Sequence, residues 1–524
     1  MNRIRSAVLG LALFAATPAM AENTIARWLS SEPDTLDPQR TISAYADQVD
    51  QDLFEGLVRF DRDKHPVPGL AESWEISPDG LTYSFHLRPE LHWSNGEALT
   101  SQDFVYAFRR LVDPKTAAAD IEPARAMVNA EAIAAGKVAD PEALGVKAPD
   151  PRSLVITLAY PRSTELSLLA SRFGYPLHRA TIERWGNDWT KPEHMVSDGP
   201  YQLKSWVPHD QIVLARSQSY YGRDGIAVET VRHVVSDDDG TALRRFQTGE
   251  LDTCFPPTRE IPTLAERFGT ALHRAPSRQI WYLVVNMTKP PLGTDPRLRE
   301  ALDLAIDREI LTGRIYVRGE VPAYGDVPPM ISNYTPQSLG FAATPKAARL
   351  ARARQLLKEA GYGPDHPLAI ELSYGTSDET RTLLSAIAHM WKTELGVETN
   401  LSNQEFQIYL QALSQHNFQL AALGYNADFD DAGEFLRLYR SQGSSFNVGG
   451  FDDADYDKLL AQSDATLDPS VRREALQQAE KRLMTEMPIL PIYFGAENML
   501  VSKRVQGWID SDRFTESRFL SVKE

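Results

Sequence analysis

Two clusters of aspartates come closest to a metal site in residue type and spacing. They occupy residues 428–433 (DFDDAG) and 453–457 (DADYD), and alternating carboxylates of this kind begin a calcium-binding loop. The first cluster has Ala432 at the fifth ligand position and Tyr439 in place of the bidentate glutamate, and the second has Lys458 where the loop needs glycine. We therefore expect neither cluster to bind a metal, and we expect the second to begin a helix as its cap.

The sequence also lacks the groupings that perform covalent chemistry. Cys254 is the only cysteine, so no intramolecular disulfide can form, and we expect its thiol to be buried and inert. No phosphate-binding G-x-x-x-x-G-K-[ST], no H-E-x-x-H and no G-x-S-x-G occurs, and the eleven histidines show no metal-ligand spacing. The sequence therefore predicts a protein that is not an enzyme and that holds no cofactor.

The N-terminus predicts export from the cytoplasm. Arg3 and Arg5 precede an apolar run over residues 7–16, and residues 19–21 (AMA) supply the pattern that signal peptidase cleaves. This run is too short to span a bilayer, and because Glu22 follows instead of cysteine, we expect no lipid anchor. Cleavage after residue 21 removes two arginines and changes the net charge from −16 to −18, which disfavours nucleic acid and anionic membranes as partners.

Strand and helix patterns alternate along the chain, which predicts a mixed α/β (α+β) fold. A length of 524 residues suffices for two or three lobes, and because no repeat or low-complexity linker occurs, we expect the lobes to be interleaved in sequence. Apolar periodicity locates the elements. The expected strands cover residues 25–29, 81–87, 280–285, 368–372 and 489–494, and the expected helices begin at Thr100 and cover residues 297–311, 347–360 and 471–484.

One long stretch is far more specific than these patterns. Residues 74–88 (WEISPDGLTYSFHLR), 93–96 (WSNG) and 100–105 (TSQDFV) together resemble the signature of the peptide and nickel solute-binding proteins, family 5 of the substrate-binding proteins of ABC importers. The resemblance covers essentially the whole mature chain and is strongest to the oligopeptide-binding branch. Further matching segments are residues 31–38, 52–57, 199–201, 249–252, 297–302, 305–308, 321–324, 395–397, 403–405 and 491–493.

The resemblance implies a fold like that of the type II periplasmic binding proteins. Two lobes clamp a ligand about a hinge, and an additional third lobe packs alongside. The implied segments are a signal peptide over residues 1–21, lobe I over 22–44, 170–276 and 495–524, the extra lobe II over 45–169, and lobe III over 277–494.

The implied function is transport. We expect a monomeric periplasmic protein that captures oligopeptides or peptide-like amines by closure of two lobes and delivers them to an ABC permease and ATPase complex in the inner membrane. One alternative is the same role for a non-peptide solute, such as an opine, a conjugated amine or an amphipathic small molecule. A secreted chaperone-like or signalling binder without a transporter is an alternative from another class.

The resemblance also implies where the ligand binds. In the oligopeptide-binding branch an aspartate pairs with the free ammonium of the peptide, and the matching segment here, residues 424–429 (GYNADF), gives Asp428 that role. Backbone edges of this segment and of the loop near Ser31 are expected to pair with the ligand, and aromatic side chains to form the pocket walls. The expected ligand-binding residues are Ser31, Glu32, Tyr106, Trp281, Tyr282, Phe406, Gly424, Tyr425, Asn426, Ala427 and Asp428.

The sequence departs from the oligopeptide-binding branch at several positions. Where that branch has an arginine and a histidine that hold peptide carboxylates, this sequence has Ala422 and Thr380, and Arg278 and Asn426 replace a cysteine pair of the relatives. Either another cation substitutes for the lost anchors, or the ligand ends without a charge there. The nearest candidate cations in the sequence are Arg314, Arg318 and Arg381.

Overall fold

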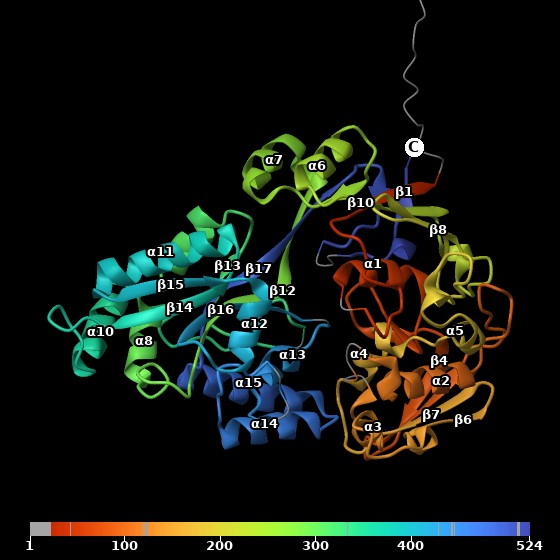
Figure 1. Cartoon of the computed structure of the whole chain (residues 1–524), viewed down its shortest axis with the longest axis horizontal. Coiled ribbons are helices and arrows are strands. Elements are labelled where there is room, and N and C mark those ends of the chain that lie inside the picture. Colours follow the sequence, from red (N-terminus) through yellow and green to blue (C-terminus); the bar gives the residue numbers. More distant parts are fainter. Residues whose placement is uncertain are drawn as a thin grey trace, which may run out of the picture.

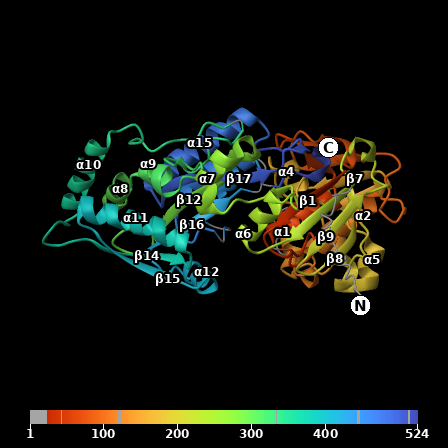
Figure 2. The ribbon, with the colours of Figure 1, turned by 90° about the horizontal axis from the view of Figure 1, so that it is seen from above.

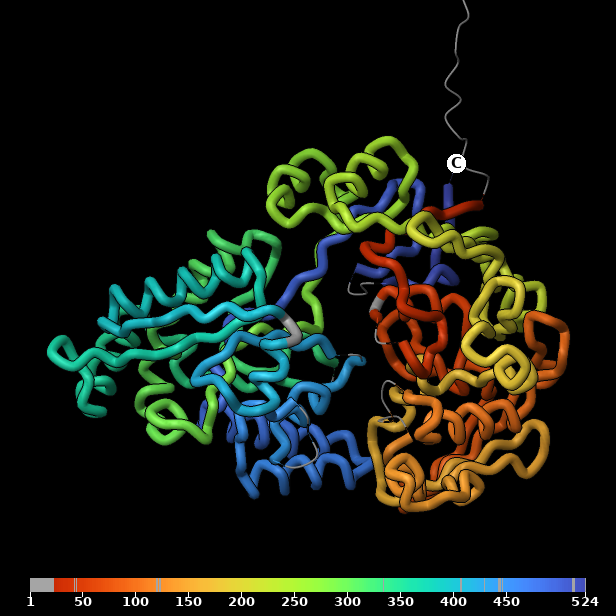
Figure 3. The backbone as a smooth tube through the Cα atoms, in the orientation of Figure 1, coloured from red at the N-terminus to blue at the C-terminus, as the bar shows by residue number. Residues whose placement is uncertain are grey.

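The computed structural model describes residues 23–523, apart from residues 42, 119–120, 122–123, 333, 428, 442–443, 445 and 511–513. Two halves lie side by side, as Figures 1 and 2 show. The N-terminal half comprises residues 23–271 and 502–523, and the C-terminal half comprises residues 286–488. The strands β12 (Leu272–Val285) and β17 (Ile489–Val501) carry the chain from one half to the other, and Figure 3 follows both crossings along the backbone.

One mixed sheet of eleven strands extends through both halves. Its order is β15-β14-β16-β12-β17-β11-β1-β10-β9-β8, with β13 paired to β17. β12 and β17 pair antiparallel with each other along both parts of the sheet, so the two halves share one hydrogen-bonded framework. The other strands of this sheet are β1 (Thr24–Leu29), β8 (Tyr201–Val207), β9 (Gln211–Arg216), β10 (Thr230–Val235), β11 (Thr253–Cys254), β13 (Val321–Pro322), β14 (Ala369–Gly375), β15 (Glu398–Gln404) and β16 (Leu420–Asn426).

Smaller sheets and many helices complete the fold. A four-stranded antiparallel sheet in the N-terminal half has the order β4-β5-β7-β6, and two pairs, β2 with β3 and β18 with β19, form short hairpin-like ladders. These strands are β2 (Val58–Phe60), β3 (Pro66–Pro68), β4 (Ala71–Ile76), β5 (Thr82–Leu87), β6 (Val146–Asp150), β7 (Ser153–Thr157), β18 (Val505–Gln506) and β19 (Ser521–Val522). The helices are α1 (Ala44–Leu53), α2 (Ser101–Val112), α3 (Ala130–Ala134), α4 (Glu165–Leu169), α5 (Arg179–Trp185), α6 (Asp239–Gln247), α7 (Ile261–Phe268), α8 (Pro296–Leu304), α9 (Arg308–Ile310), α10 (Lys346–Glu359), α11 (Asp378–Leu395), α12 (Phe406–Ser414), α13 (Gly433–Leu436), α14 (Ala454–Asp464) and α15 (Pro469–Glu486).

Apolar side chains form separate cores. The largest lies in the C-terminal half, between Ile280 and Phe494 in sequence, and a second, between Leu57 and Val196, surrounds the four-stranded sheet. Two further clusters surround β1. Helix α1 contributes Val49 to a core around β1, although the sequence places residue 45 at the start of a separate lobe. The lobe boundaries expected from the sequence stay a prediction.

Most expected elements are present with ends shifted by a few residues. The clear exception is the helix expected over residues 297–311, which the structure divides into α8, α9 and a π-helical turn at Leu311–Ile315. The break has a local cause, because the Asp307 carboxylate accepts a hydrogen bond from the amide of Ile310 at 3.2 Å and so caps a new helix start. The strand expected at 489–494 continues to Val501 because it crosses between the halves.

The crossing strands are interrupted by a bulge. Their register changes between the pairs Pro276 with Ala496 and Ile280 with Phe494, so three residues of β12 lie opposite Gly495 alone. A Cβ atom at Gly495 would lie 2.6 Å from the hydroxyl oxygen of Ser277, which explains the glycine there. A bulge bends a strand and breaks the ladder locally, so it is the natural place for a hinge.

Among the fully buried carboxyl groups in the core of the C-terminal half, those of Asp326 and Glu480 are neighbours. Glu480 accepts hydrogen bonds from the amides of Asp326 and Val327, both at 2.9 Å, from the Tyr334 hydroxyl at 2.8 Å and from the Gln337 amide at 2.7 Å. Burial raises the pKa of Glu480 to about 7. Burial, followed by the neighbouring charge of Glu480, also raises the pKa of Asp326.

This pair predicts a pH-dependent stability. A carboxyl whose pKa rises on folding stabilises the fold fully below its unfolded pKa of 4.5, and that stabilisation is lost as the pH rises through about 7. The loss is on the order of 3 kcal/mol for Glu480. The wild type should therefore melt at a lower temperature at about pH 8 than at about pH 5. We expect Glu480→Gln to reduce this decrease in melting temperature, measured by circular dichroism.

The matched control is Glu474→Gln, which changes an exposed glutamate on the same helix and should leave that difference unchanged. If Glu480→Gln and Glu474→Gln show the same pH dependence as the wild type, Glu480 is ionised in the folded protein throughout this range and the assignment is wrong.

Candidate ligand-binding site

Strand β16 has one edge that is only partly paired. It pairs with β12 over its whole length, from Leu420 to Asn426, but with β14 only at Leu420 and Ala421. The amide of Ala427 donates a hydrogen bond to the Arg278 carbonyl oxygen at 2.9 Å. In an antiparallel pair every second residue directs its N–H and C=O groups to the partner strand, so Ala427 and Tyr425 face β12 in this way. It follows that the N–H and C=O groups of Gly424 and Asn426 point away from β12, toward the edge that β14 leaves open. An extended ligand can add to this edge as a further strand.

An aromatic platform covers one face of the sheet beside this edge. The rings of Trp281 and Tyr493 are stacked, with centroids 6.0 Å apart and planes inclined by 14°, and Tyr316 meets Tyr493 edge-on at 5.3 Å. A Cβ atom at Gly424 would lie 2.8 Å from the indole nitrogen of Trp281, so the indole lies directly over this glycine. Tyr493 was not among the expected ligand-binding residues, although it lies in the matching segment at residues 491–493.

Tyr425 points to the opposite face of β16. Its ring meets Phe435 and Phe446 nearly edge-on, at 5.8 and 5.9 Å, and its hydroxyl donates to Glu434 at 3.4 Å. Phe446 is 58% exposed, so this face offers apolar surface to a ligand. Glu434 and Phe446 also line a pocket between the two halves.

That pocket has a volume of about 360 Å³ and is lined by both halves. The N-terminal half contributes Tyr160 and neighbouring charged residues, and the C-terminal half contributes residues of α13, α14 and α15. Arg472 of α15 connects the two sides, since it forms a bidentate ion pair with Asp431 at 2.6 and 2.7 Å while its Nε donates to the Ser163 hydroxyl at 2.7 Å. The remaining basic residues of the lining are Arg125, Arg162, Arg437 and Arg440.

The structure does not bring all the expected ligand-binding residues together. Trp281, Gly424, Tyr425, Asn426 and Ala427 lie side by side on β12 and β16 and immediately after β16. Asp428 lies outside the described residues, and Phe406 begins α12 but its side chain is not among those described.

Tyr282 was expected to line the pocket and does not. It is 4% exposed and packs against Tyr439 in the core of the C-terminal half, at a centroid distance of 6.1 Å. The reason is strand geometry, because neighbouring residues of β12 face opposite sides of the sheet and Trp281 takes the open side.

The loop after β1 lies across from β16, in the N-terminal half. Ser31 is exposed there. The carboxylate of Glu32 is held by its own half, since it accepts hydrogen bonds from the Trp206 indole and from the amide of His209, the latter at 2.6 Å. The side chain of Glu32 therefore positions the loop, because its carboxylate is already engaged by Trp206 and His209.

Tyr106 lies on α2 in a second pocket, of about 610 Å³, whose lining comes from the N-terminal half alone. The Arg179 guanidinium lies over its ring at 5.7 Å. Tyr106 therefore lies in the N-terminal half and is not among the residues that line the pocket between the halves. Tyrosine has an apolar ring and a polar hydroxyl, which suits a half-buried position at the protein surface.

Ala422 and Thr380 replace the two cations that hold peptide carboxylates in the oligopeptide-binding branch, and the structure describes both positions. Ala422 is 4% exposed, and its carbonyl accepts from the buried Tyr409 hydroxyl at 2.6 Å, while Thr380 lies in the first turn of α11. Among the candidate cations, Arg318 is bound by Glu320 and Glu379, Arg381 is bound by Asp378 at 3.0 Å, and Arg314 is exposed.

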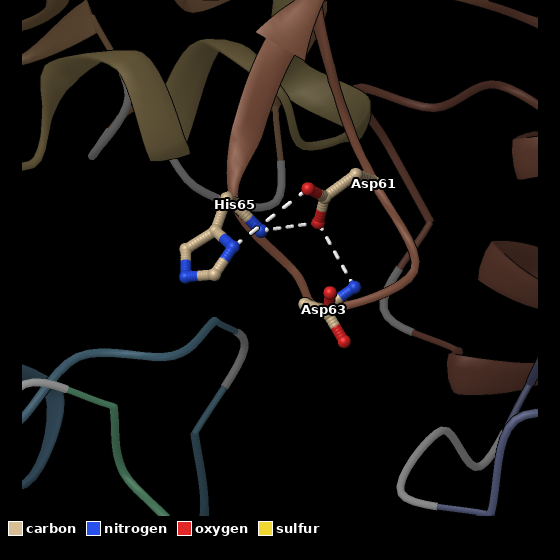
Figure 4. Close-up of side chains that lie close together, drawn as sticks. All are labelled: Asp61, Asp63 and His65. Atoms are coloured by element: carbon tan, nitrogen blue, oxygen red, sulfur yellow. Dashed lines mark hydrogen bonds and ion pairs between the residues drawn. The ribbon is translucent and has the colours of Figure 1, made fainter.

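The second aspartate cluster, at residues 453–457, has a structural role. Asp453 accepts from the amide of Tyr456 at 2.8 Å and caps α14, as expected. A third group, Asp61, Asp63 and His65, lies at the exposed turn between β2 and β3, where Figure 4 shows Asp61 accepting from the amides of Asp63 and His65, both at 2.9 Å. One oxygen of Asp61 is thus committed to the turn, and we assign the group a turn-forming role.

Cys254 is fully buried in β11, and burial raises the pKa of its thiol, so it is a core residue as expected. Within the described residues, no helix combines the length and the apolar character that crossing a membrane requires.

This arrangement, two halves joined by two strands with a partly unpaired strand edge between them, defines a class of solute-binding protein. The family model described as "Bacterial extracellular solute-binding proteins, family 5 Middle" matches residues 65–447. The chain belongs to this family, which confirms the resemblance and the mixed α/β, type II binding-protein fold.

Individual relatives cover nearly the whole chain. It is 35% identical over 480 residues to the probable deoxycholate-binding periplasmic protein YgiS of Escherichia coli, covering 91% of this chain and 89% of YgiS. It is 34% identical over 513 residues to the periplasmic oligopeptide-binding protein OppA of the same organism, covering 96% and 93%. The solved unliganded open form of MppA, a murein tripeptide-binding protein, is similar with a TM-score of 0.85 at 32% identity, covering 96% and 98%.

The contact between Trp281 and Gly424 predicts a specific effect of substitution. Gly424→Ala places a methyl group against the indole, which must move off Tyr493, and overpacking of this kind costs about 1–3 kcal/mol. We expect a lower melting temperature together with an altered tryptophan emission spectrum.

Gly340→Ala is the matched control, because Gly340 is exposed and a Cβ there meets nothing within 4 Å. Equal melting temperatures for the two variants would show that the indole does not constrain position 424.

Proposed function

We propose that the protein is the periplasmic substrate-binding component of an ABC importer, and that it captures oligopeptides or peptide-like amines by closing its two halves around them. The observation that carries this proposal is the open edge of β16 at Gly424 and Asn426, on the sheet that joins the halves. Main-chain groups of a strand edge recognise any peptide backbone, whatever its side chains. The relatives OppA and MppA, named for oligopeptide and murein tripeptide binding, support the same ligand class.

The proposed ligand lies between the β16 edge and the backbone of the loop at Ser31 and Glu32. Trp281 and Tyr425 flank the edge on its two faces. Asp428, which follows this segment in the sequence, is proposed to pair with the ligand ammonium, because a desolvated ammonium needs a charged partner. The protein acts by binding alone.

The proposal includes export and partners. Residues 1–21 serve as a cleaved signal peptide, and the mature protein works in the periplasm as a monomer without a lipid anchor. Its partners are a permease and ATPase complex in the inner membrane. The lobes are proposed as residues 22–44, 170–276 and 495–524, residues 45–169, and residues 277–494.

A second candidate is the same transport role for an amphipathic, non-peptide solute. Two observations favour it. Position 422, where the oligopeptide-binding branch has a cation, is the buried Ala422, and the relative YgiS is named for probable deoxycholate binding. Mass spectrometry of the solute that copurifies with the protein separates the two candidates.

Closure of the halves is the first test of the proposed function. With two halves joined at a bulge, bound ligand should bring them together and reduce the radius of gyration measured by small-angle X-ray scattering. A trialanine concentration of about 100 times the dissociation constant should also stabilise the protein by roughly 2.7 kcal/mol. An unchanged radius of gyration at saturation would exclude the clamp.

The strand edge has its own test. Asn426→Pro removes the N–H that points to the open edge and leaves the ladder with β12 intact, since that ladder does not use this N–H. We expect calorimetry to show trialanine binding weakened by about tenfold or more, the loss of a hydrogen bond together with an unpaired ligand carbonyl.

Asn426→Ala is the control, because it removes the side chain and keeps the N–H. If Asn426→Pro is folded and binds trialanine as the wild type does, the ligand does not pair with β16. If neither the wild type nor the variants bind trialanine, the non-peptide candidate replaces the peptide.

A further inference from the structure

Arg278 occupies the crossing between the two halves. It is the middle residue of the three in β12 that lie opposite Gly495, and it pairs with Ala427 through the 2.9 Å hydrogen bond to its carbonyl. The register between β12 and β16 is regular here, so Arg278 lies on the same face of the sheet as Ile280 and Tyr425. Tyr282 and the core of the C-terminal half occupy most of this face, and at its margin Tyr425 contacts Phe446, which lines the pocket between the halves.

The Arg278 side chain lacks the partners that other arginines of this region have. It is half-buried, and its Nε atom is buried without a hydrogen-bond partner. Across the part of the chain that the structure describes, no ion pair to Arg278 is present, whereas Arg318 is bound by Glu320 and Arg472 by Asp431. A guanidinium keeps its charge at all physiological pH values, so this is a permanent positive charge.

A partly buried charge without a counterion is unfavourable, and a protein with a net charge of −16 has carboxylates in excess to pair with it. Arg278 lies on β12, across β16 from its open edge. Because neighbouring strands are about 4.8 Å apart, the long Arg278 side chain can extend over the end of β16 toward a molecule bound at that edge. A ligand carboxylate can accept two parallel hydrogen bonds from one guanidinium, which is a strong and directional contact.

We propose that Arg278 determines ligand specificity by binding a carboxylate of the ligand, in place of the cation missing at Ala422. The proposal deepens the proposed function and rests on it, because it places the ligand at the β16 edge. It identifies the substrate class as solutes that carry an acidic group near the end of that edge. Arg278 thereby contributes recognition of charge to a site whose other contacts are backbone groups and aromatic rings.

The first experiment compares trialanine with its C-terminal amide, by calorimetry, on the wild type, Arg278→Gln and Arg381→Gln. We expect the wild type to bind the acid at least about tenfold more tightly than the amide, a difference of about 1.4 kcal/mol. Arg278→Gln should reduce this ratio to near one, and Arg381→Gln, which removes an exposed arginine already paired with Asp378, should preserve it. A ratio near one in the wild type, or an unchanged ratio in Arg278→Gln, overturns the proposal.

The second experiment does not depend on a peptide ligand. The solute that copurifies with the full-length protein is identified by mass spectrometry for the wild type and for both variants. A solute with an acidic group that is depleted from Arg278→Gln and retained by Arg381→Gln supports the proposal. A solute without an acidic group overturns the role of Arg278 while leaving the solute-binding function intact, so the two failures are distinguishable.

Discussion

The pairing of β12 with β17 is the constraint on which the rest of the structure depends. These two strands belong to the sheet in both halves, and their ladder is interrupted by the bulge at Gly495 and by a second register shift between Trp281 and Tyr282. Trp281 and Tyr493 lie immediately beyond the bulge on the same two strands and stack on each other. Any rotation of the halves about the bulge therefore moves the aromatic platform relative to the N-terminal half. In the proposed function, chain connectivity therefore couples closure of the halves to contact with the ligand, and no separate relay between hinge and site is needed.

In the proposed function, the site recognises its ligand mainly through the backbone. Gly424 and Asn426 present main-chain groups to the open edge, and the Glu32 carboxylate positions its loop through Trp206 and His209. Backbone recognition tolerates varied ligands, since every peptide offers the same donors and acceptors. Discrimination must then come from the few side chains that reach the ligand, and a charge is the most selective of these because an unmatched charge is costly to bury.

The family and most elements of the fold could be predicted from the sequence, and the geometry of the site only in part. Alternation at 81–87 located β5, and the segment at residues 74–88 identified the family, yet both lie in the N-terminal half, away from β16. Alternation also shows that Trp281 and Tyr282 face opposite sides of a strand, but it does not say which side is the core. That choice depends on Tyr439, more than 150 residues away in sequence. The break at Asp307 and the place of Tyr106 are likewise set by contacts that no local pattern contains.

The arginines that line the pocket between the halves show why a single cation can determine ligand specificity. Arg472 is bound by Asp431 and Arg440 by Asp464, so their charges are neutralised before any ligand arrives. Such ion pairs fix side-chain positions and contribute little net field, because each positive charge has its negative partner within hydrogen-bond distance. A ligand entering this pocket therefore meets a preorganised, nearly neutral wall. Only a cation without a protein counterion gains by pairing with the ligand, and that gain is the physical basis on which an acidic solute is distinguished from a neutral one of the same shape.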